Sequence, residues 1–107
     1  MYIARALTHQ SEFFAAVDQV TSALPSEVAE VFTALGTDWD GESAVFFKVI
    51  LKDNAIPRPE LLAFTRQVSR AIVQQVGPLE EWGVLPHFRF LTQTEYAPVK
   101  EVEPAWA

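Results

Sequence analysis

The chain reads Gly36-Thr37-Asp38-Trp39-Asp40-Gly41-Glu42 at a predicted turn, and Ser43-Ala44-Val45-Phe46-Phe47-Lys48-Val49-Ile50-Leu51-Lys52 follows it directly. An Asp-Gly pair between two apolar runs is a strong signal for a β-hairpin, because the two-residue turn that matches the twist of the strands needs positive φ at both central residues. We therefore expect a strand over residues 43–52, with an antiparallel partner directly before the turn.

That partner, residues 28–35, is open to two interpretations. Its larger apolar residues recur at helical spacing, at Val28, Val31, Phe32 and Leu35. Its β-branched and aromatic content, and its short length between Pro25 and Gly36, are instead typical of a strand. The hairpin favours the strand, because residues 43–52 need a neighbour.

The rest of the chain predicts two helices and a third strand. Apolar residues at helical spacing predict a helix over residues 8–24, and Pro57 and Gly77 bound a second one. Residues 84–93 alternate like a strand, and residues 94–107 are expected to form an extended C-terminal arm. The chain is thus predicted to be a single domain, residues 1–107, with a two-layer α+β fold. The order is α-β-β-α-β, with two helices on one face of a three-stranded sheet.

A two-residue loop at Asp40-Gly41 would fix the two faces of the hairpin, with Leu35 opposite Phe46 and Val31 opposite Ile50. The face expected to pack on the helices carries Phe32, Ala34, Val45, Phe47, Val49 and Leu51. The outer face carries Val31, Leu35, Phe46 and Ile50, interrupted by Thr33 and Lys48. Such an apolar set is unusual on a solvated face. We expect it to form a homodimer interface or to bind a partner, or else to be covered by the C-terminal arm or the first helix.

Composition narrows the class of protein. Eight basic residues against fourteen acidic ones give a formal net charge of −6, which argues against nucleic-acid binding and suits a basic protein partner. The chain contains no cysteine, so disulfides and thiolate metal sites are excluded. We see neither a signal peptide nor a membrane-spanning run of apolar residues, and expect a cytoplasmic bacterial protein.

A few residues have side chains suited to binding. Lys48, His87 and Arg89 are expected to share the outer face, where they would form a small cationic patch for an anionic ligand. Trp39 would offer a stacking surface beside the turn, or simply pack on the sheet. The carboxylates around the turn are interpreted as turn chemistry, so no metal site is predicted. No catalytic motif and no cofactor-binding motif is found.

Four segments carry a resemblance: the turn Gly36–Ala44, the run Val45–Leu51, the strand Phe88-Arg89-Phe90 and the closing Glu103-Pro104-Ala105-Trp106. They are similar to short uncharacterised bacterial proteins that occur in mobile gene cassettes and beside toxin–antitoxin-like genes. That resemblance implies no activity. The order of elements also partly resembles a type II KH domain, but its Gly-x-x-Gly loop and one helix are missing and the net charge has the wrong sign for RNA binding.

Two hypotheses about function follow. The first is a small non-enzymatic protein-interaction module, homodimeric or an accessory, antitoxin-like protein that meets a basic partner. The second is a small-ligand-binding protein or an enzyme that uses the outer sheet face and the Asp38–Gly41 turn.

Overall fold

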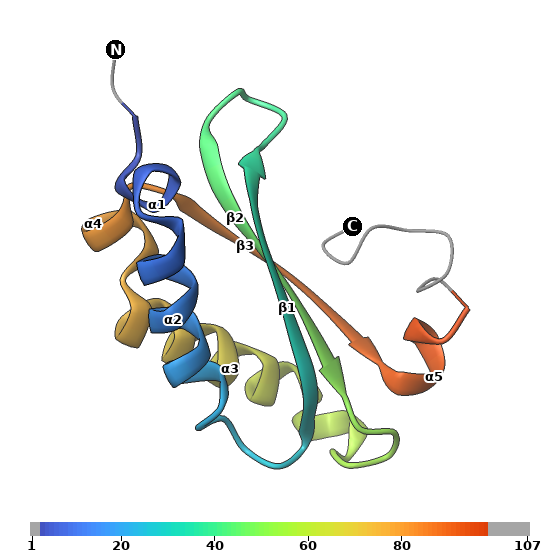
Figure 1. The fold of residues 1–107 in the computed structure, drawn as a ribbon. Coiled ribbons are helices and arrows are strands. Elements are labelled where there is room, and N and C mark those ends of the chain that lie inside the picture. Colours follow the sequence, from blue (N-terminus) through green and yellow to red (C-terminus); the bar gives the residue numbers. More distant parts are fainter. Residues whose placement is uncertain (1–2, 99–107) are drawn as a thin grey trace.

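The computed structural model describes residues 3–98 and shows an α+β fold (Figure 1). Two helices, Arg5–Thr8 (α1) and Gln10–Thr21 (α2), lead into the strands Val28–Thr37 (β1) and Ser43–Leu51 (β2). A 3-10 turn over Arg58–Glu60 (η1) opens the helix Leu61–Val76 (α3), which is followed by the short helix Pro78–Trp82 (α4). The described chain ends with the strand Leu85–Thr92 (β3) and the helical turn Gln93–Tyr96 (α5).

The sheet is mixed, with β2 in the centre. β1 pairs with β2 antiparallel, and β3 pairs with the other edge of β2 in parallel. The parallel pairing requires the chain to cross the sheet between β2 and β3, and α3 makes that crossing. The prediction that residues 28–35 form a strand is confirmed, and so are the strands expected at 43–52 and 84–93.

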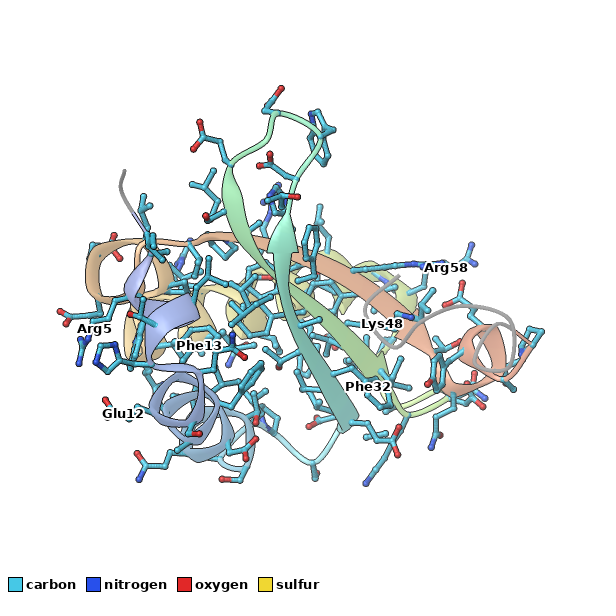
Figure 2. The ribbon with its side chains drawn as sticks, turned by 45° about the horizontal axis from the view of Figure 1, so that its top comes forward. Arg5, Glu12, Phe13, Phe32, Lys48 and Arg58 are labelled. Atoms are coloured by element: carbon cyan, nitrogen blue, oxygen red, sulfur yellow. The ribbon has the colours of Figure 1, made fainter. Side chains whose placement is uncertain are left out.

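The main helices cover one face of the sheet (Figure 1). α2 contributes Phe13 and Val17 to the core, α3 contributes Val68 and Ile72, and Phe47 of β2 lies beneath them. Burial of these large apolar side chains is the main stabilising contribution of the fold. Figure 2 shows Phe13 on this helical side of the sheet.

Two glycine-containing turns set where the elements end. Gly77 ends α3 with a φ of 63°, a left-handed conformation that glycine adopts without steric cost, and its amide hydrogen-bonds to the carbonyl of Val73. Any Cβ at this position would lie 2.9 Å from Cγ of Glu81. Gly41, in the turn between β1 and β2, also has a left-handed conformation, with a φ of 81°.

The predicted register of the hairpin is wrong by one residue. Ala34, not Leu35, lies opposite Phe46, and Leu35 lies opposite Val45. The loop has three residues, Trp39-Asp40-Gly41, because Gly41 alone has positive φ and Asp40 does not, so the two-residue turn cannot form. The backbone N–H of Asp38 closes the loop by donating to the carbonyl of Glu42 over 3.0 Å.

A shift of one residue moves the side chains of β1 from Glu30 onward to the other face of the sheet, while the irregular pairing between Val28 and Glu30 leaves Val28 on the helical side. Val31 and Leu35, predicted to lie on the outer face, pack against the helical core, while Phe32 and Ala34 lie on the outer face. The faces of β2 and β3 are as expected. We call the following set the outer face: Glu30, Phe32 and Ala34 of β1, Phe46, Lys48 and Ile50 of β2, and His87, Arg89 and Leu91 of β3.

The C-terminal arm is only partly as predicted. Its first residues form α5, a helical turn at the far end of β3, rather than extended chain. α5 lies away from the layer formed by α2 and α3 (Figure 1). The remainder of the predicted arm, residues 99–107, lies outside the described residues, and with it the prediction that the arm covers the outer face.

Candidate functional site on the outer face

The hairpin tip, Asp38–Glu42, is ordered by one carboxylate. Oδ1 of Asp38 accepts hydrogen bonds from the backbone N–H groups of Asp40, over 2.9 Å, and Glu42, over 3.0 Å. The N–H of Gly41 donates to the carbonyl of Asp38 over 3.0 Å. Asp38 therefore satisfies the backbone donors of a loop that extends beyond the helical layer (Figure 1).

His87 of β3 lies beside this loop. Its Nε2 is 3.4 Å from Oδ2 of Asp38, an ion-pair distance when the imidazole is protonated but long for a hydrogen bond. The Nε2 atom is shielded from solvent and has no hydrogen-bond partner within the described part of the chain. The Asp38 side chain is only 4 % exposed. Asp38 thus holds the loop with one oxygen and faces His87 with the other.

The pKa of Asp38 reflects this arrangement. Burial of the side chain raises the pKa of its carboxyl, but the hydrogen bonds from Glu42 and Asp40 and the neighbouring imidazole of His87 together outweigh burial. The net pKa lies below the ordinary value of 3.8. The carboxyl is therefore ionised at neutral pH, as its role in accepting backbone hydrogen bonds requires.

Three rings form a row at this end of the outer face. The imidazole of His87 stacks on Phe46, with centroids 5.3 Å apart and planes 20° apart. The indole of Trp39 lies on the loop side of His87, with centroids 5.4 Å apart. We call Trp39, His87 and Phe46 the aromatic row. Trp39 is its exposed end, because 84 % of that residue is accessible to solvent.

The opposite end of the outer face is ordered by a second aspartate. Asp53 accepts the backbone N–H of Thr94 over 3.0 Å and the Thr94 hydroxyl over 2.7 Å. Thr92 and Glu95 cap α5 reciprocally, each side chain accepting a hydrogen bond from the backbone N–H of the other residue. The Thr94 hydroxyl, and then its N–H, lower the pKa of Asp53 below 3.8. These contacts tie α5 to the loop that follows β2.

α5 places Tyr96 over the outer face. The rings of Tyr96 and Phe32 have centroids 5.5 Å apart, and Nζ of Lys48 lies 5.5 Å from the centre of the Tyr96 ring. Lys48 is fully buried and Ile50 is 1 % exposed. Figure 2 shows Phe32 and Lys48 on the side of the sheet opposite Phe13. The centre of the outer face is therefore not a solvated surface.

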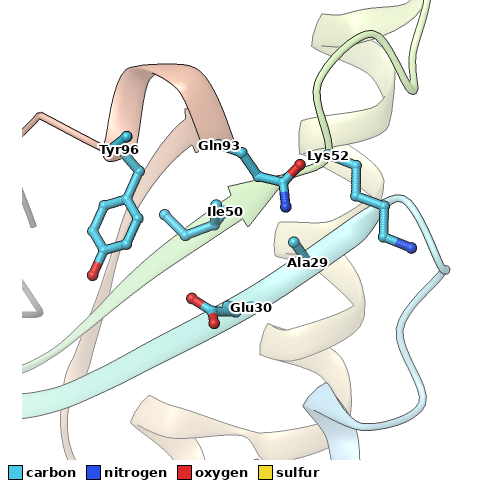
Figure 3. A pocket seen from close by; sticks show the side chains of 7 residues that line it. Ala29, Glu30, Ile50, Lys52, Gln93 and Tyr96 are labelled. Atoms are coloured by element: carbon cyan, nitrogen blue, oxygen red, sulfur yellow. The ribbon is translucent and has the colours of Figure 1, made fainter.

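A shallow depression of about 390 Å³ lies between α5 and β1. Figure 3 shows Tyr96 at one end, Lys52 at the other and Ile50 between them, with Glu30 and Ala29 contributed by β1. Gln93 of α5 completes the polar lining. The volume of this depression is at the lower end of the range for ligand pockets.

The predicted ligand-binding residues do not form one site. Trp39 and His87 are brought together, as part of the aromatic row. Lys48 and Arg89 are cross-strand neighbours, but Lys48 is buried, so the expected cationic patch on an open surface is not formed. Of the predicted interface residues, Phe46 and Ile50 lie on the outer face, whereas Val31 and Leu35 do not.

Two parts of the candidate site were missed in the sequence. Tyr96 and its support by Asp53 join residues more than forty positions apart, a contact that no local pattern indicates. The capping box at Thr92-Gln93-Thr94-Glu95 does have a sequence signal, because threonine followed three residues later by glutamate is a helix-start pattern. This pattern predicts a helix start at Thr92, where an extended arm was expected.

Within residues 3–98 no three histidine or acidic side chains are grouped so that they could hold a metal ion. No helix in the same range is long and apolar enough to cross a bilayer. Comparisons of the chain with models of protein families, with curated proteins and with solved structures find no match.

Proposed function

We propose that this protein is a small non-enzymatic protein-interaction module that binds a partner through its hairpin tip and the adjoining aromatic row. The observation that carries the proposal is the 84 % exposure of Trp39 on a loop that Asp38 holds in place. Tryptophan is among the residues that dominate binding energy at protein interfaces. A single exposed apolar side chain is ordinary, but the ring of Trp39 contacts His87, which stacks on Phe46, and Asp38 orders the backbone that carries it.

Rigid presentation supports the proposal energetically. A loop that is already ordered loses little conformational entropy when a partner binds, so more of the contact energy appears as affinity. The net charge of −6 adds a long-range attraction for a basic partner, which salt would weaken.

Site-specific cross-linking tests the proposal. A photoreactive residue at Thr37, which is exposed next to the tip, is expected to give a discrete adduct in cells that express the protein. The same group at Gln19 on α2, also exposed, is the control. The Thr37 adduct should disappear when Trp39→Ala is added. Equal labelling from both positions, or an adduct that ignores Trp39→Ala, would refute the proposal.

A second copy of the chain is one partner that this experiment would reveal. Phe46 remains the residue by which to test the predicted homodimer, because it lies on the outer face and is half-buried. Native mass spectrometry of the wild type and of Phe46→Glu measures this directly. A dimer that dissociates in the variant would support self-association, and an unchanged mass would count against it.

The depression between α5 and β1 favours a second candidate function, binding of a small ligand. The carboxylate of Glu30 and the amide of Gln93 lie near the apolar side chain of Ile50, while Lys52 lines the far end of the depression with its ammonium directed away from them (Figure 3). A carboxylate and an amide side by side suit the ammonium and carboxylate groups of a ligand such as a free amino acid. Thermal-shift measurements with amino acids, repeated on Glu30→Gln, test it, because a ligand that binds only the folded state raises apparent stability. No shift with any amino acid would remove this candidate.

A further inference from the structure

The hairpin tip combines an open aromatic surface with carboxylates. Asp40 directly follows Trp39 and Glu42 closes the loop three residues after Trp39, and both acidic residues are exposed. Neither carboxylate has a hydrogen bond or an ion pair with another residue in the described range, since only Asp38 uses its side chain to order the loop. The hairpin tip, Asp38–Glu42, contains no lysine or arginine. Its charge is therefore negative and uncompensated at the exposed end.

The indole of Trp39 is accessible on the side away from His87. The two rings are tilted by 54° and the residue remains 84 % exposed, so a further group has room to approach the indole. A cation is attracted to the face of an aromatic ring, most strongly to that of tryptophan. The chain itself contains this geometry elsewhere, where the guanidinium carbon of Arg5 lies 4.4 Å from the centre of the Trp82 ring.

Building on the proposed function, we propose that the hairpin tip recognises a cationic side chain of a basic protein partner, with arginine preferred. The guanidinium group would lie on the free face of Trp39 and pair with the carboxylates of Asp40 and Glu42. Arginine suits this arrangement better than lysine, because its planar guanidinium both stacks on aromatic rings and donates paired hydrogen bonds to a carboxylate. The complementary charge of the loop argues for this partner over an acidic or purely apolar one.

NMR titration with defined peptides tests the recognition. The probes are capped five-residue peptides in which glycine alternates with arginine, lysine or glutamine. The arginine peptide is expected to shift the indole N–H of Trp39 and the amides of the tip. It should bind more tightly than the lysine peptide, and the glutamine peptide should not bind.

Matched variants separate local recognition from general charge attraction. Asp40→Asn with Glu42→Gln removes two charges at the tip, and Glu12→Gln with Asp18→Asn removes two from exposed positions on α2. The tip pair is expected to weaken arginine-peptide binding about three- to fivefold, and so is Trp39→Ala, as an exposed cation–π contact implies. The α2 pair should bind like the wild type. Backbone chemical shifts outside the tip check that each variant keeps the fold.

If the tip pair and the α2 pair of substitutions weaken binding of the arginine peptide equally, then binding depends only on net charge, and the inference is wrong. Retained binding in Trp39→Ala, or equal binding of the glutamine peptide, would overturn it as well. The proposed function has a separate readout. Suppose that a cross-linked partner requires Trp39 but the arginine peptide binds no better than the others. That result would support the proposed interaction module and refute only the recognition of a cationic side chain.

Discussion

Asp38 and Asp53 lie at opposite ends of β2, and each accepts hydrogen bonds that fix a neighbouring turn. The pKa of each carboxyl is below its ordinary value. The results of the two arrangements differ. The turn that Asp38 orders leaves Trp39 exposed to solvent, whereas the turn that Asp53 orders places Tyr96 against Phe32.

This difference separates a ring that stabilises the fold from one that does not. Tyr96 contacts Phe32 and Lys48 of the outer face, so its removal uncovers groups that are now shielded. Trp39 is largely exposed and shields few other groups from solvent, so it contributes little to the free energy of unfolding. A large aromatic side chain that is held in place without contributing to the core is available for binding, which is the basis of the function proposed for the tip.

Tyr96→Ala is expected to have the largest effect on stability. Loss of the ring contacts with Phe32 and Lys48 should lower the free energy of unfolding by about 1–2 kcal/mol. Urea denaturation at pH 7 measures it. Tyr96→Phe keeps the ring and is the matched control. If Tyr96→Ala is as stable as the wild type, then α5 does not help to hold the outer face.

Gly41→Ala should come next. The φ of 81° is strained for any residue with a Cβ, and no atom lies within 4 Å of that Cβ, so the cost is purely conformational. We expect a loss of about 1 kcal/mol. Gly36→Ala is the comparison, because its φ is not positive and its Cβ would only contact the ring of Phe46 at 3.4 Å. Equal effects of the two substitutions would contradict the three-residue loop.

Substitutions of Asp53 and Asp38 should differ in how much of the protein they destabilise. Each has a lowered pKa in the folded state, so each contributes stability above its ordinary value of 3.8 and loses it as the pH falls through the folded-state pKa. The destabilisation caused by Asp53→Asn should therefore be larger at pH 7 than at about pH 2. Thermal unfolding across that range gives the curve, and a constant difference would show that the charge of Asp53 does not contribute.

Asp38→Asn should show the same dependence on pH with a smaller global effect, because an exposed loop can open without unfolding the core. Amide hydrogen exchange distinguishes the two. Exchange should accelerate at Asp40 and Glu42 in Asp38→Asn while the β2 core remains protected. Accelerated exchange throughout β2 would mean that the hairpin tip is part of the cooperative core.

Trp39→Ala should have the smallest effect on folding. With 84 % of the residue exposed, the change in the free energy of unfolding is expected to stay within about 0.5 kcal/mol. The same denaturation experiment measures it. A loss as large as that of Tyr96→Ala would erase the contrast between the two rings and weaken the case for Trp39 as a binding residue.

Local patterns in the sequence determined the elements of this protein and their order. The apolar periodicity of residues 13–20 and 61–76, and the alternation of β2 and β3, follow from helical and strand geometry, so the α+β fold was predictable. The sequence also singled out Trp39 and His87, though not that their rings meet. The faces of β1 depended on a loop of two or three residues, and the Asp-Gly pair is compatible with both.

Only the tertiary structure decided what each aromatic ring does. The register of the hairpin was fixed by the side chain of Asp38 and the φ values of the loop, and a shift of one residue moved Val31 and Leu35 into the core. The cover over Lys48 depends on α5, which Asp53 holds from the loop that follows the neighbouring strand β2. Contacts between residues so far apart in the chain leave no local pattern in the sequence. They arise only when the parallel pairing of β2 and β3 brings the C-terminal ends of these two strands together.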